Sequence, residues 1–184
     1  MSQELTVPVD YAAAREALLS RCPAPKRSQI DDTLYRRPDG ALARLRRQDM
    51  VTRLSCTASP KAPGTASMPG ASRTSRLEPE TIVLDEHASR RLLEILGFEA
   101  ADRVRFIRET WRSCRYLLHL DRVEGLGDYI TVQAEQGAYP PDIYRRLALK
   151  QLKSMGIRAA WDRLDSPQPV PYTASITRAA SAPS

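Results

Sequence analysis

The sequence predicts an α+β fold in which antiparallel strands, flanked by helices, close into a β barrel. Strand-like segments outnumber helical ones along the 184 residues. No alternation of strands with helices dominates, which argues against a parallel sheet of βαβ units. Arginines also recur at alternate positions of several strands, a pattern that suits a closed or nearly closed barrel with a charged interior.

The N-terminal third predicts a strand, a helix and a hairpin. Residues 3–9 are partly β-branched, and Asp10 can cap the helix that follows. Pro38-Asp39-Gly40 has turn chemistry and joins two neighbouring strands. The further strands predicted here are residues 29–36, 42–47 and 51–57.

The second half predicts two helices and more antiparallel strands. Asp85 opens a helix that stops at Gly97, and Pro140-Pro141-Asp142 starts another that stops at Gly156. The apolar positions of the first of these helices are Ala88, Leu92, Leu93, Ile95 and Leu96. The predicted strands are residues 74–84, 104–111, 116–123 and 129–133, the last two joined by a Gly-containing hairpin connection.

Length and composition predict one domain with mobile appendages. With 42% hydrophobic residues, 184 residues can bury one core but are short for two. We therefore expect one domain over residues 1–165. Residues 58–72 are rich in Ala, Ser, Thr, Pro and Gly and predict a flexible loop, and residues 166–184 predict an extended tail.

Charge and cysteine content narrow the partners and the compartment. The net charge of +6 favours anionic partners such as phosphates, nucleotides or nucleic acid. The three cysteines are widely spaced and lack CxxC pairing, so neither a disulfide framework nor a zinc ribbon is indicated. No apolar segment is long enough to span a membrane, and we expect an intracellular, cytoplasmic protein. Nothing in the sequence specifies an oligomeric state.

One segment points to a known family. Residues 119–129, HLDRVEGLGDY, resemble the signature of CYTH proteins, which include class IV adenylate cyclases and thiamine or inorganic triphosphatases. In that family a strand ending in Leu-Asp-x-Val leads through Gly-Leu-Gly into a final barrel strand, and the other segments occur here in a similar order. The resemblance implies a triphosphate tunnel lined by Lys and Arg, with Glu residues holding a divalent metal ion.

The resemblance implies a triphosphate-binding site at Arg44, Arg46 and Arg108. Arg44 and Arg46 stand two positions apart on a predicted strand and so face the same side. Arg108 lies where the family places an Arg in the strand before the signature. The alternative is that these arginines line the outward face of the barrel wall rather than the tunnel. We expect replacement of Arg44 and Arg46 by Ala to weaken triphosphate binding with little loss of folding.

The metal-binding half of the family's site is poorly matched. Glu4 is retained from the opening motif, and Glu78 is a candidate middle-strand carboxylate, whereas Thr131 and Gln133 stand where the family has two Glu. Mg²⁺ or Mn²⁺ would be the cofactor if activity remains. Expected cations are likewise replaced, by Thr57, Phe106 and Leu117. The alternative is that nearby residues take over the roles of the missing carboxylates and cations, namely Arg53, Lys61, Arg73, Arg76 and Glu135.

These observations favour a divergent CYTH-domain protein, a catalytically impaired pseudoenzyme that binds a triphosphate, nucleotide or other phosphorylated polyanion. The alternative is an active metal-dependent triphosphatase or class IV-type adenylate cyclase with a rearranged metal site. A nucleic-acid-binding module is less favoured, because aromatics interleaved with Arg are lacking. No residue is assigned as catalytic, and His119, beside Asp121, is interpreted as a packed histidine.

Overall fold

The computed structural model describes residues 4–57, 80–113, 115–134 and 139–158. These residues form three helices and eight strands. The pairs β1–β8, β2–β3, β3–β4, β4–β5, β6–β7 and β7–β8 are antiparallel, so the α+β class is confirmed. The predicted loop 58–72, Glu78 and the predicted tail 166–184 lie outside the described residues. No helix in the described part of the chain is long and apolar enough to cross a membrane.

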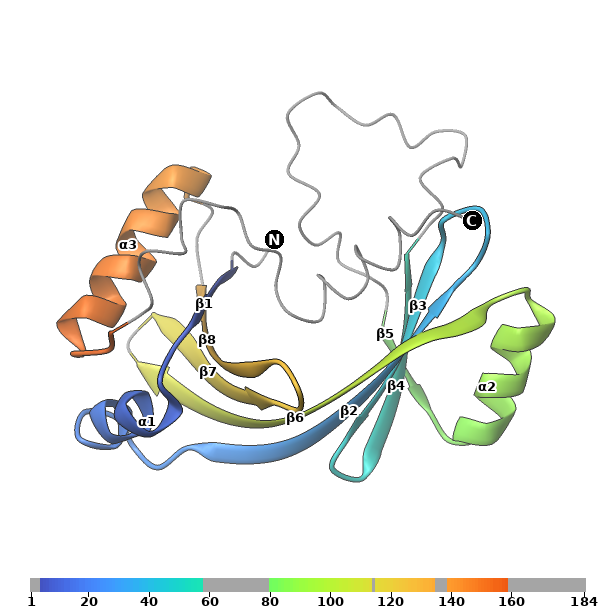
Figure 1. Cartoon of the computed structure of the whole chain (residues 1–184), viewed down its shortest axis with the longest axis horizontal. Coiled ribbons are helices and arrows are strands. Elements are labelled where there is room, and N and C mark those ends of the chain that lie inside the picture. The colour runs from blue at the N-terminus through green and yellow to red at the C-terminus, as the bar shows by residue number, and fades with distance from the viewer. Residues whose placement is uncertain (1–3, 58–79, 114, 135–138, 159–184) are drawn as a thin grey trace. The chain divides into compact units, whose positions relative to one another are not determined.

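The strands follow the order β1-β8-β7-β6-β2-β3-β4-β5. β1 and β5 stand at the two ends of this order, so the sheet is open and closure into a barrel is not confirmed. The described residues divide into two compact units, one of residues 4–29 and 105–158 and the other of residues 30–57 and 80–104 (Figure 1). Strands β2 (Lys26–Arg36) and β6 (Glu99–Ser113) contribute to both.

The first unit places two helices on one face of its strands. Its other elements are β1 (Glu4–Pro8), α1 (Tyr11–Leu19), β7 (Tyr116–Val123), β8 (Gly127–Ala134) and α3 (Pro141–Ser154). Ile130 and Val132 of β8 pack in one core cluster with Leu18 of α1 and Leu152 of α3. Because successive strand residues point to opposite faces, Thr131 and Gln133 belong to the face away from the helices.

The second unit has one helix against its sheet. Its other elements are β3 (Leu42–Gln48), β4 (Val51–Thr57), β5 (Glu80–Val83) and α2 (Glu86–Ile95). Tyr35 of β2 and Leu45 of β3 pack in a core cluster with Leu93 of α2 and Phe98. The residues that alternate with these, on the opposite face, include Asp32, Arg44 and Arg46.

The predicted helix boundaries are confirmed by their caps. The Asp10 and Asp85 side chains each accept a hydrogen bond of 2.9 Å, from the backbone N–H of Ala13 and of Ala88. The predicted strand 104–111 is too short, since β6 begins at Glu99 and ends at Ser113. Its first residues, EAADR, have no alternating apolar pattern, so the sequence carried no signal for the extension.

Candidate anion-binding site

Three arginines share one face of the second unit. Arg44 and Arg46 alternate with Ala43 and Leu45, which are buried in the core beside α2, so both point to the opposite face. Arg53 of β4 is the direct cross-strand neighbour of Arg46. We call the side chains of this surface the arginine face, and its members are Asp32, Arg44, Arg46, Arg53, Ser55 and Glu80.

Arg46 is engaged by a buried carboxylate. Its Nε donates to Asp32 Oδ1 at 2.8 Å and its Nη2 donates to Oδ2 at 2.6 Å. The Asp32 side chain has 0% of its surface exposed and that of Arg46 has 14%. Removing one partner of a buried pair leaves an uncompensated charge, which is strongly destabilising. The structure therefore overturns the expectation that Arg46 can be replaced with little loss of folding.

Arg44 and Arg53 share a much weaker carboxylate partner. Glu80 Oε1 lies 3.8 Å from Arg44 Nη2, and Glu80 Oε2 lies 3.7 Å from Arg53 Nε. Both distances exceed hydrogen-bonding range, and the Glu80 side chain is 41% exposed. Such ion pairs contribute about 0–1 kcal/mol, so another anion can replace Glu80 at small cost.

Ser55 lies between these charges. In the strand register it is the neighbour of Arg44 on one side and of Glu80 on the other. The residue is 2% exposed, and its Oγ has no hydrogen-bond partner among the described residues. An unsatisfied buried hydroxyl costs about 1–3 kcal/mol. An anion that displaced Glu80 could accept a hydrogen bond from this hydroxyl.

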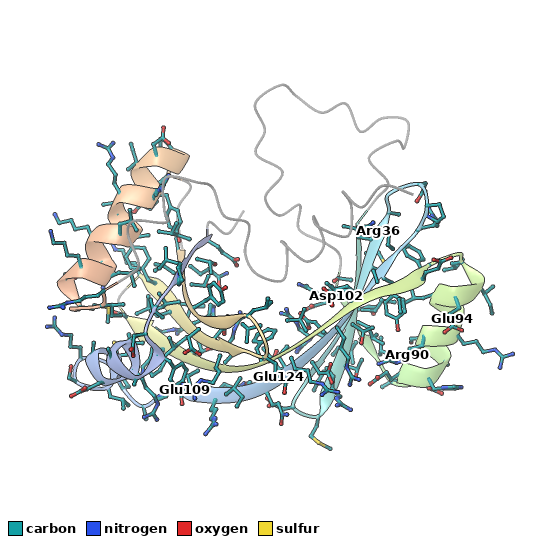
Figure 2. The ribbon with its side chains drawn as sticks, viewed as in Figure 1. Arg36, Arg90, Glu94, Asp102, Glu109 and Glu124 are labelled. Atoms are coloured by element: carbon teal, nitrogen blue, oxygen red, sulfur yellow. The ribbon has the colours of Figure 1, made fainter. Side chains whose placement is uncertain are left out.

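The charges of the arginine face do not balance. Three arginines stand against the two carboxylates of Asp32 and Glu80, which leaves one excess positive charge. A fourth arginine, Arg36, follows on the same face at the end of β2 (Figure 2). Anions are thus favoured at this surface, where the ion pairs of Arg44 and Arg53 with Glu80 are longer than that of Arg46 with Asp32.

The residues implied as a metal site gather on the polar face of the first unit but do not suit a metal ion. Glu4 is opposite Gln133, and Thr6 is opposite Thr131, in the pairing of β1 with β8. The two threonine hydroxyls are hydrogen bonded to each other at 2.8 Å. Glu4 is then the one carboxylate of this set, whereas hard divalent cations take several charged oxygen ligands. The described ranges contain no group of three or more His, Cys, Asp or Glu that could hold a metal.

Arg108 and His119 are also engaged within the first unit. Arg108 donates two hydrogen bonds of 2.7 Å to Asp121, whose side chain is 4% exposed. Thr110 Oγ1 lies 3.0 Å from His119 Nδ1, and Gln133 Oε1 lies 3.1 Å from His119 Nε2. Both ring nitrogens of His119 are therefore within hydrogen-bonding distance of a side chain, and His119 is a packed, hydrogen-bonded residue.

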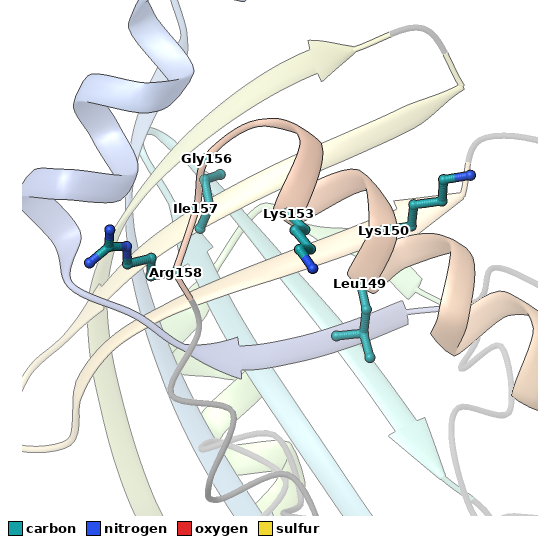
Figure 3. A pocket seen from close by; sticks show the side chains of 6 residues that line it. All are labelled: Leu149, Lys150, Lys153, Gly156, Ile157 and Arg158. Atoms are coloured by element: carbon teal, nitrogen blue, oxygen red, sulfur yellow. The ribbon is translucent and has the colours of Figure 1, made fainter.

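A separate hollow lies at the C-terminal end of α3. It has a volume of 690 Å³ and is lined by Leu149, Lys150, Lys153, Gly156, Ile157 and Arg158 (Figure 3). The two lysines and the arginine of this hollow are exposed and lie near the C-terminal end of a helix. The helix dipole by itself favours positive charge at that position. None of the predicted site residues lines this hollow.

The sequence analysis does not identify three members of the arginine face, Asp32, Ser55 and Glu80. It names Arg53 only as a substitute from a nearby position. The available signal was alternation along β4, where Arg53 and Ser55 stand two positions apart. Their closeness to Arg44 and Glu80 depends on strand register, which the sequence does not specify when a flexible segment separates the strands.

Comparison with known proteins supports the fold. No protein-family model matches the chain, and no curated protein matches its sequence. The protein PH1012 of Pyrococcus horikoshii OT3 has a TM-score of 0.67 at 16% identity, over 86% of this chain and 92% of that one.

Two similar structures carry names that point to nucleotide chemistry. A proposed adenylate cyclase from Vibrio parahaemolyticus has a TM-score of 0.67 at 16% identity, over 96% of this chain and 97% of that one. A proposed adenylyl cyclase from Hippeastrum, described as having a dominant triphosphatase activity, has a TM-score of 0.57 at 17% identity, over 93% and 98%. The chain therefore has a CYTH-like fold, and at these identities the similarity concerns the fold alone.

Proposed function

We propose that this protein binds a phosphorylated anion, a triphosphate or a nucleotide, on the arginine face, and that it has lost the metal-dependent catalysis of CYTH enzymes. The observation that carries the proposal is the weak bridge from Glu80 to Arg44 and Arg53 beside the buried Ser55 hydroxyl. Guanidinium groups suit phosphate oxygens because their planar N–H donors match phosphate geometry.

The fold supports the choice of ligand. The Hippeastrum protein, whose structure resembles this one, is described as a triphosphatase. Arg44 and Arg46 keep the positions that the CYTH resemblance assigns to phosphate contacts, although Asp32 engages Arg46. Arg44 and Arg53 are accordingly the residues that we assign to the anion, with Ser55 as a further donor. Arg108 is assigned at most a secondary contribution to anion binding, because it already donates two hydrogen bonds to Asp121.

The proposed loss of catalysis follows from the donor set beside Glu4. Phosphoryl transfer depends on cations that neutralise charge as it develops, and metal ions usually supply much of that stabilisation. Thr131 and Gln133 supply neutral oxygens, and the Thr131 hydroxyl is already bonded to Thr6. Binding in the absence of metal is therefore the property we expect to remain.

Calorimetric titration with inorganic triphosphate and with ATP, in EDTA and again in magnesium, tests this function. Released phosphate and pyrophosphate are assayed in the same samples. We expect saturable binding in EDTA and no turnover in either condition. Magnesium-dependent turnover would instead establish an active triphosphatase or cyclase, and the absence of binding in both conditions would refute the anion site.

A further inference from the structure

Helix α3 presents a row of basic side chains to the solvent. The residues that face the core are buried and follow one another at intervals of three or four: Tyr144, Ala148, Leu152 and Met155. Arg146, Lys150 and Lys153 are exposed, and each lies roughly 140–160° around the helix axis from Ala148. Arg158 follows the helix and lines the same hollow as the two lysines (Figure 3). We call Arg146, Lys150, Lys153 and Arg158 the α3 basic row.

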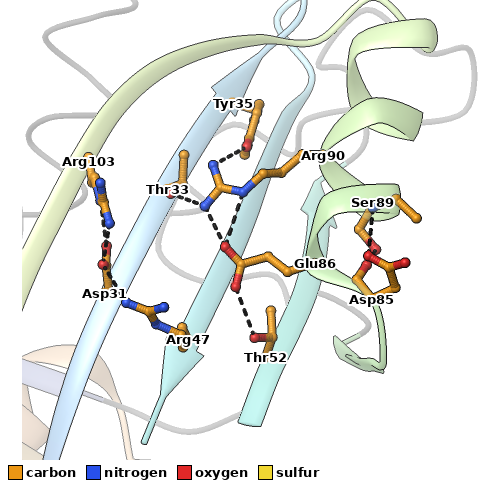
Figure 4. A network of polar contacts seen from close by, with 11 residues as sticks. Asp31, Thr33, Tyr35, Arg47, Thr52, Asp85, Glu86, Ser89, Arg90 and Arg103 are labelled. Atoms are coloured by element: carbon orange, nitrogen blue, oxygen red, sulfur yellow. Dashed lines mark hydrogen bonds and ion pairs between the residues drawn. The ribbon is translucent and has the colours of Figure 1, made fainter. Parts of the chain in front are cut away.

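The α3 basic row lacks the ion pairs that engage arginines elsewhere in the protein. In the second unit Arg90 pairs with Glu86 at 2.6 Å, and Arg103 pairs with Asp31 at 2.6 Å (Figure 4). No member of the row forms an ion pair with another residue that the structure describes. The carboxylate of α3 itself, Asp142, stands in the first turn. The positive charge of the row is therefore available to an outside partner.

Helix stability does not explain this arrangement. Arg146 and Lys150 are four positions apart, and Lys150 and Lys153 are three apart, which are spacings at which like charges destabilise a helix. The helix dipole favours Lys153, which stands in the last turn, but its effect falls off beyond that turn. It therefore does not account for Arg146 and Lys150. An anionic partner would remove the repulsion within the row.

The surroundings of the row select the class of anion. A helix that binds a membrane surface inserts its apolar face into the lipid, whereas the apolar face of α3 is buried in the core of the first unit. The core of a protein–protein interface is rich in apolar groups, and Ile143, which is 39% exposed, is the one exposed large apolar residue of α3. A nucleic-acid backbone can be bound through cations alone, and such contacts need no aromatic side chains.

The row also matches a nucleic-acid strand in length. From Arg146 to Lys153 the helix rises about 10 Å, which spans about three successive phosphates of one duplex strand at ~3.4 Å each. Lys150 and Lys153 line the hollow of 690 Å³ together with Arg158, so the basic surface continues past the end of α3. A backbone that follows the helix can therefore contact all four cations.

We propose that the α3 basic row binds the phosphate backbone of a nucleic acid without regard to sequence. Each cation that contacts a phosphate releases a condensed counterion, so binding weakens as salt is added. For four contacts to a single strand, the slope of log K against log salt concentration is about −3. The row lies in the first unit and includes no residue of the arginine face, so this inference is separate from the proposed function.

Fluorescence anisotropy of a labelled oligothymidine of about 20 nucleotides, in sodium chloride from about 25 to about 200 mM, measures this binding. In Lys150→Gln/Lys153→Gln the slope should fall from about −3 to about −1.5, and the dissociation constant at the lowest salt should rise at least ~5-fold. Lys26→Gln/Arg91→Gln removes two exposed cations outside α3 and should change the dissociation constant less than ~2-fold. Circular dichroism verifies folding. Lys150→Gln alone is the second variant, with an expected change in slope of about 0.7.

Two further titrations separate this surface from the arginine face. Triphosphate affinity should be the same in wild type and in Lys150→Gln/Lys153→Gln, and Arg53→Ala should keep the affinity for oligothymidine.

Three results would overturn the proposal. The first is wild-type protein that does not bind the oligonucleotide at the lowest salt. The second is a loss of affinity in Lys26→Gln/Arg91→Gln or in Arg53→Ala as large as that in Lys150→Gln/Lys153→Gln. The third is binding to phosphatidylserine vesicles without binding to oligothymidine, which would assign the row to membranes instead.

Discussion

Asp32 and Arg46 form a buried, doubly hydrogen-bonded ion pair across β2 and β3, with N–O distances of 2.8 and 2.6 Å. The Asp32 carboxylate is out of contact with solvent. An arginine that appears from the sequence to be a ligand-binding residue therefore also holds two strands together. Replacement of Arg46 is therefore expected to change the stability of the fold as well as ligand binding.

Arg46→Ala should lower the free energy of unfolding by about 3–5 kcal/mol, because it leaves the Asp32 carboxylate buried without its bidentate donor. Urea denaturation followed by circular dichroism measures the change. Arg47→Ala is the matched control, since Arg47 stands on the other face of β3 with 56% of its side chain exposed. That variant should lose no more than about 1 kcal/mol. Equal stability of the two variants would contradict the structural role of Arg46.

Arg53→Ala should weaken triphosphate binding by about 5–30-fold while the protein stays folded, since a hydrogen bond to a charged group contributes about 1–2 kcal/mol. Among the residues that the structure describes, Arg53 is held by a 3.7 Å ion pair with the exposed Glu80. Calorimetry gives the affinity, and thermal unfolding confirms the fold. Arg47→Ala again removes one positive charge, from the opposite face. An identical loss of affinity in both variants would mean that net charge, rather than this site, controls binding.

Glu80→Gln should increase triphosphate affinity by about 2–5-fold, because the carboxylate competes with the ligand for Arg44 and Arg53 and the competition is worth no more than about 1 kcal/mol. Glu124→Gln removes the same charge elsewhere, from an ion pair with Arg105 of 3.9 Å. Parallel titrations of both variants separate the local effect from the change in net charge. Weaker binding in Glu80→Gln would show that Glu80 supports the ligand, for example as a metal ligand.

Gln133→Glu should create weak Mn²⁺ binding, at least ~3-fold tighter than in the wild type, because the new carboxylate would lie opposite Glu4 on one face. Thr131 is a poorer position for the same change, since it is 2% exposed and bonded to Thr6. Free Mn²⁺ is measured by electron paramagnetic resonance. Gln151→Glu, on α3, adds the same charge away from Glu4. No difference between these variants would mean that the β1–β8 face does not present its oxygens to one ion.

The sequence predicted the local elements well because their signals are local. Asp10 and Asp85 cap helices through bonds to residues three positions away, and Pro38-Asp39-Gly40 forms a turn within a few residues. The alternation of Arg44 and Arg46 likewise predicted a shared face, which the register of β3 confirms. Barrel closure depends on which strands pair at the ends of the sheet, and no short pattern encodes that.

The site was predicted only in part because partners distant in sequence decide what each charge does. From the sequence, Arg46 and Arg108 are equivalent to Arg44 as candidate ligand-binding residues. In the structure Asp32 pairs with Arg46, and Asp121 pairs with Arg108. Helix α2 shows the same limit. Its apolar spacing predicted the helix, but Glu86 and Arg90 turn inward, and only the structure reveals that Leu92 and Ile95 are left outside.

The most direct test of the account is to observe the arginine side chains while the ligand binds. Two-dimensional ¹H–¹⁵N spectra of the guanidinium Nε–H groups, assigned with Arg44→Lys, Arg53→Lys and Arg47→Lys, are recorded as inorganic triphosphate is added in EDTA. We predict saturable shifts of the Arg44 and Arg53 signals, with that of Arg47 unchanged. Saturable binding that leaves the Arg44 and Arg53 signals in place would contradict the assignment of the ligand to the arginine face.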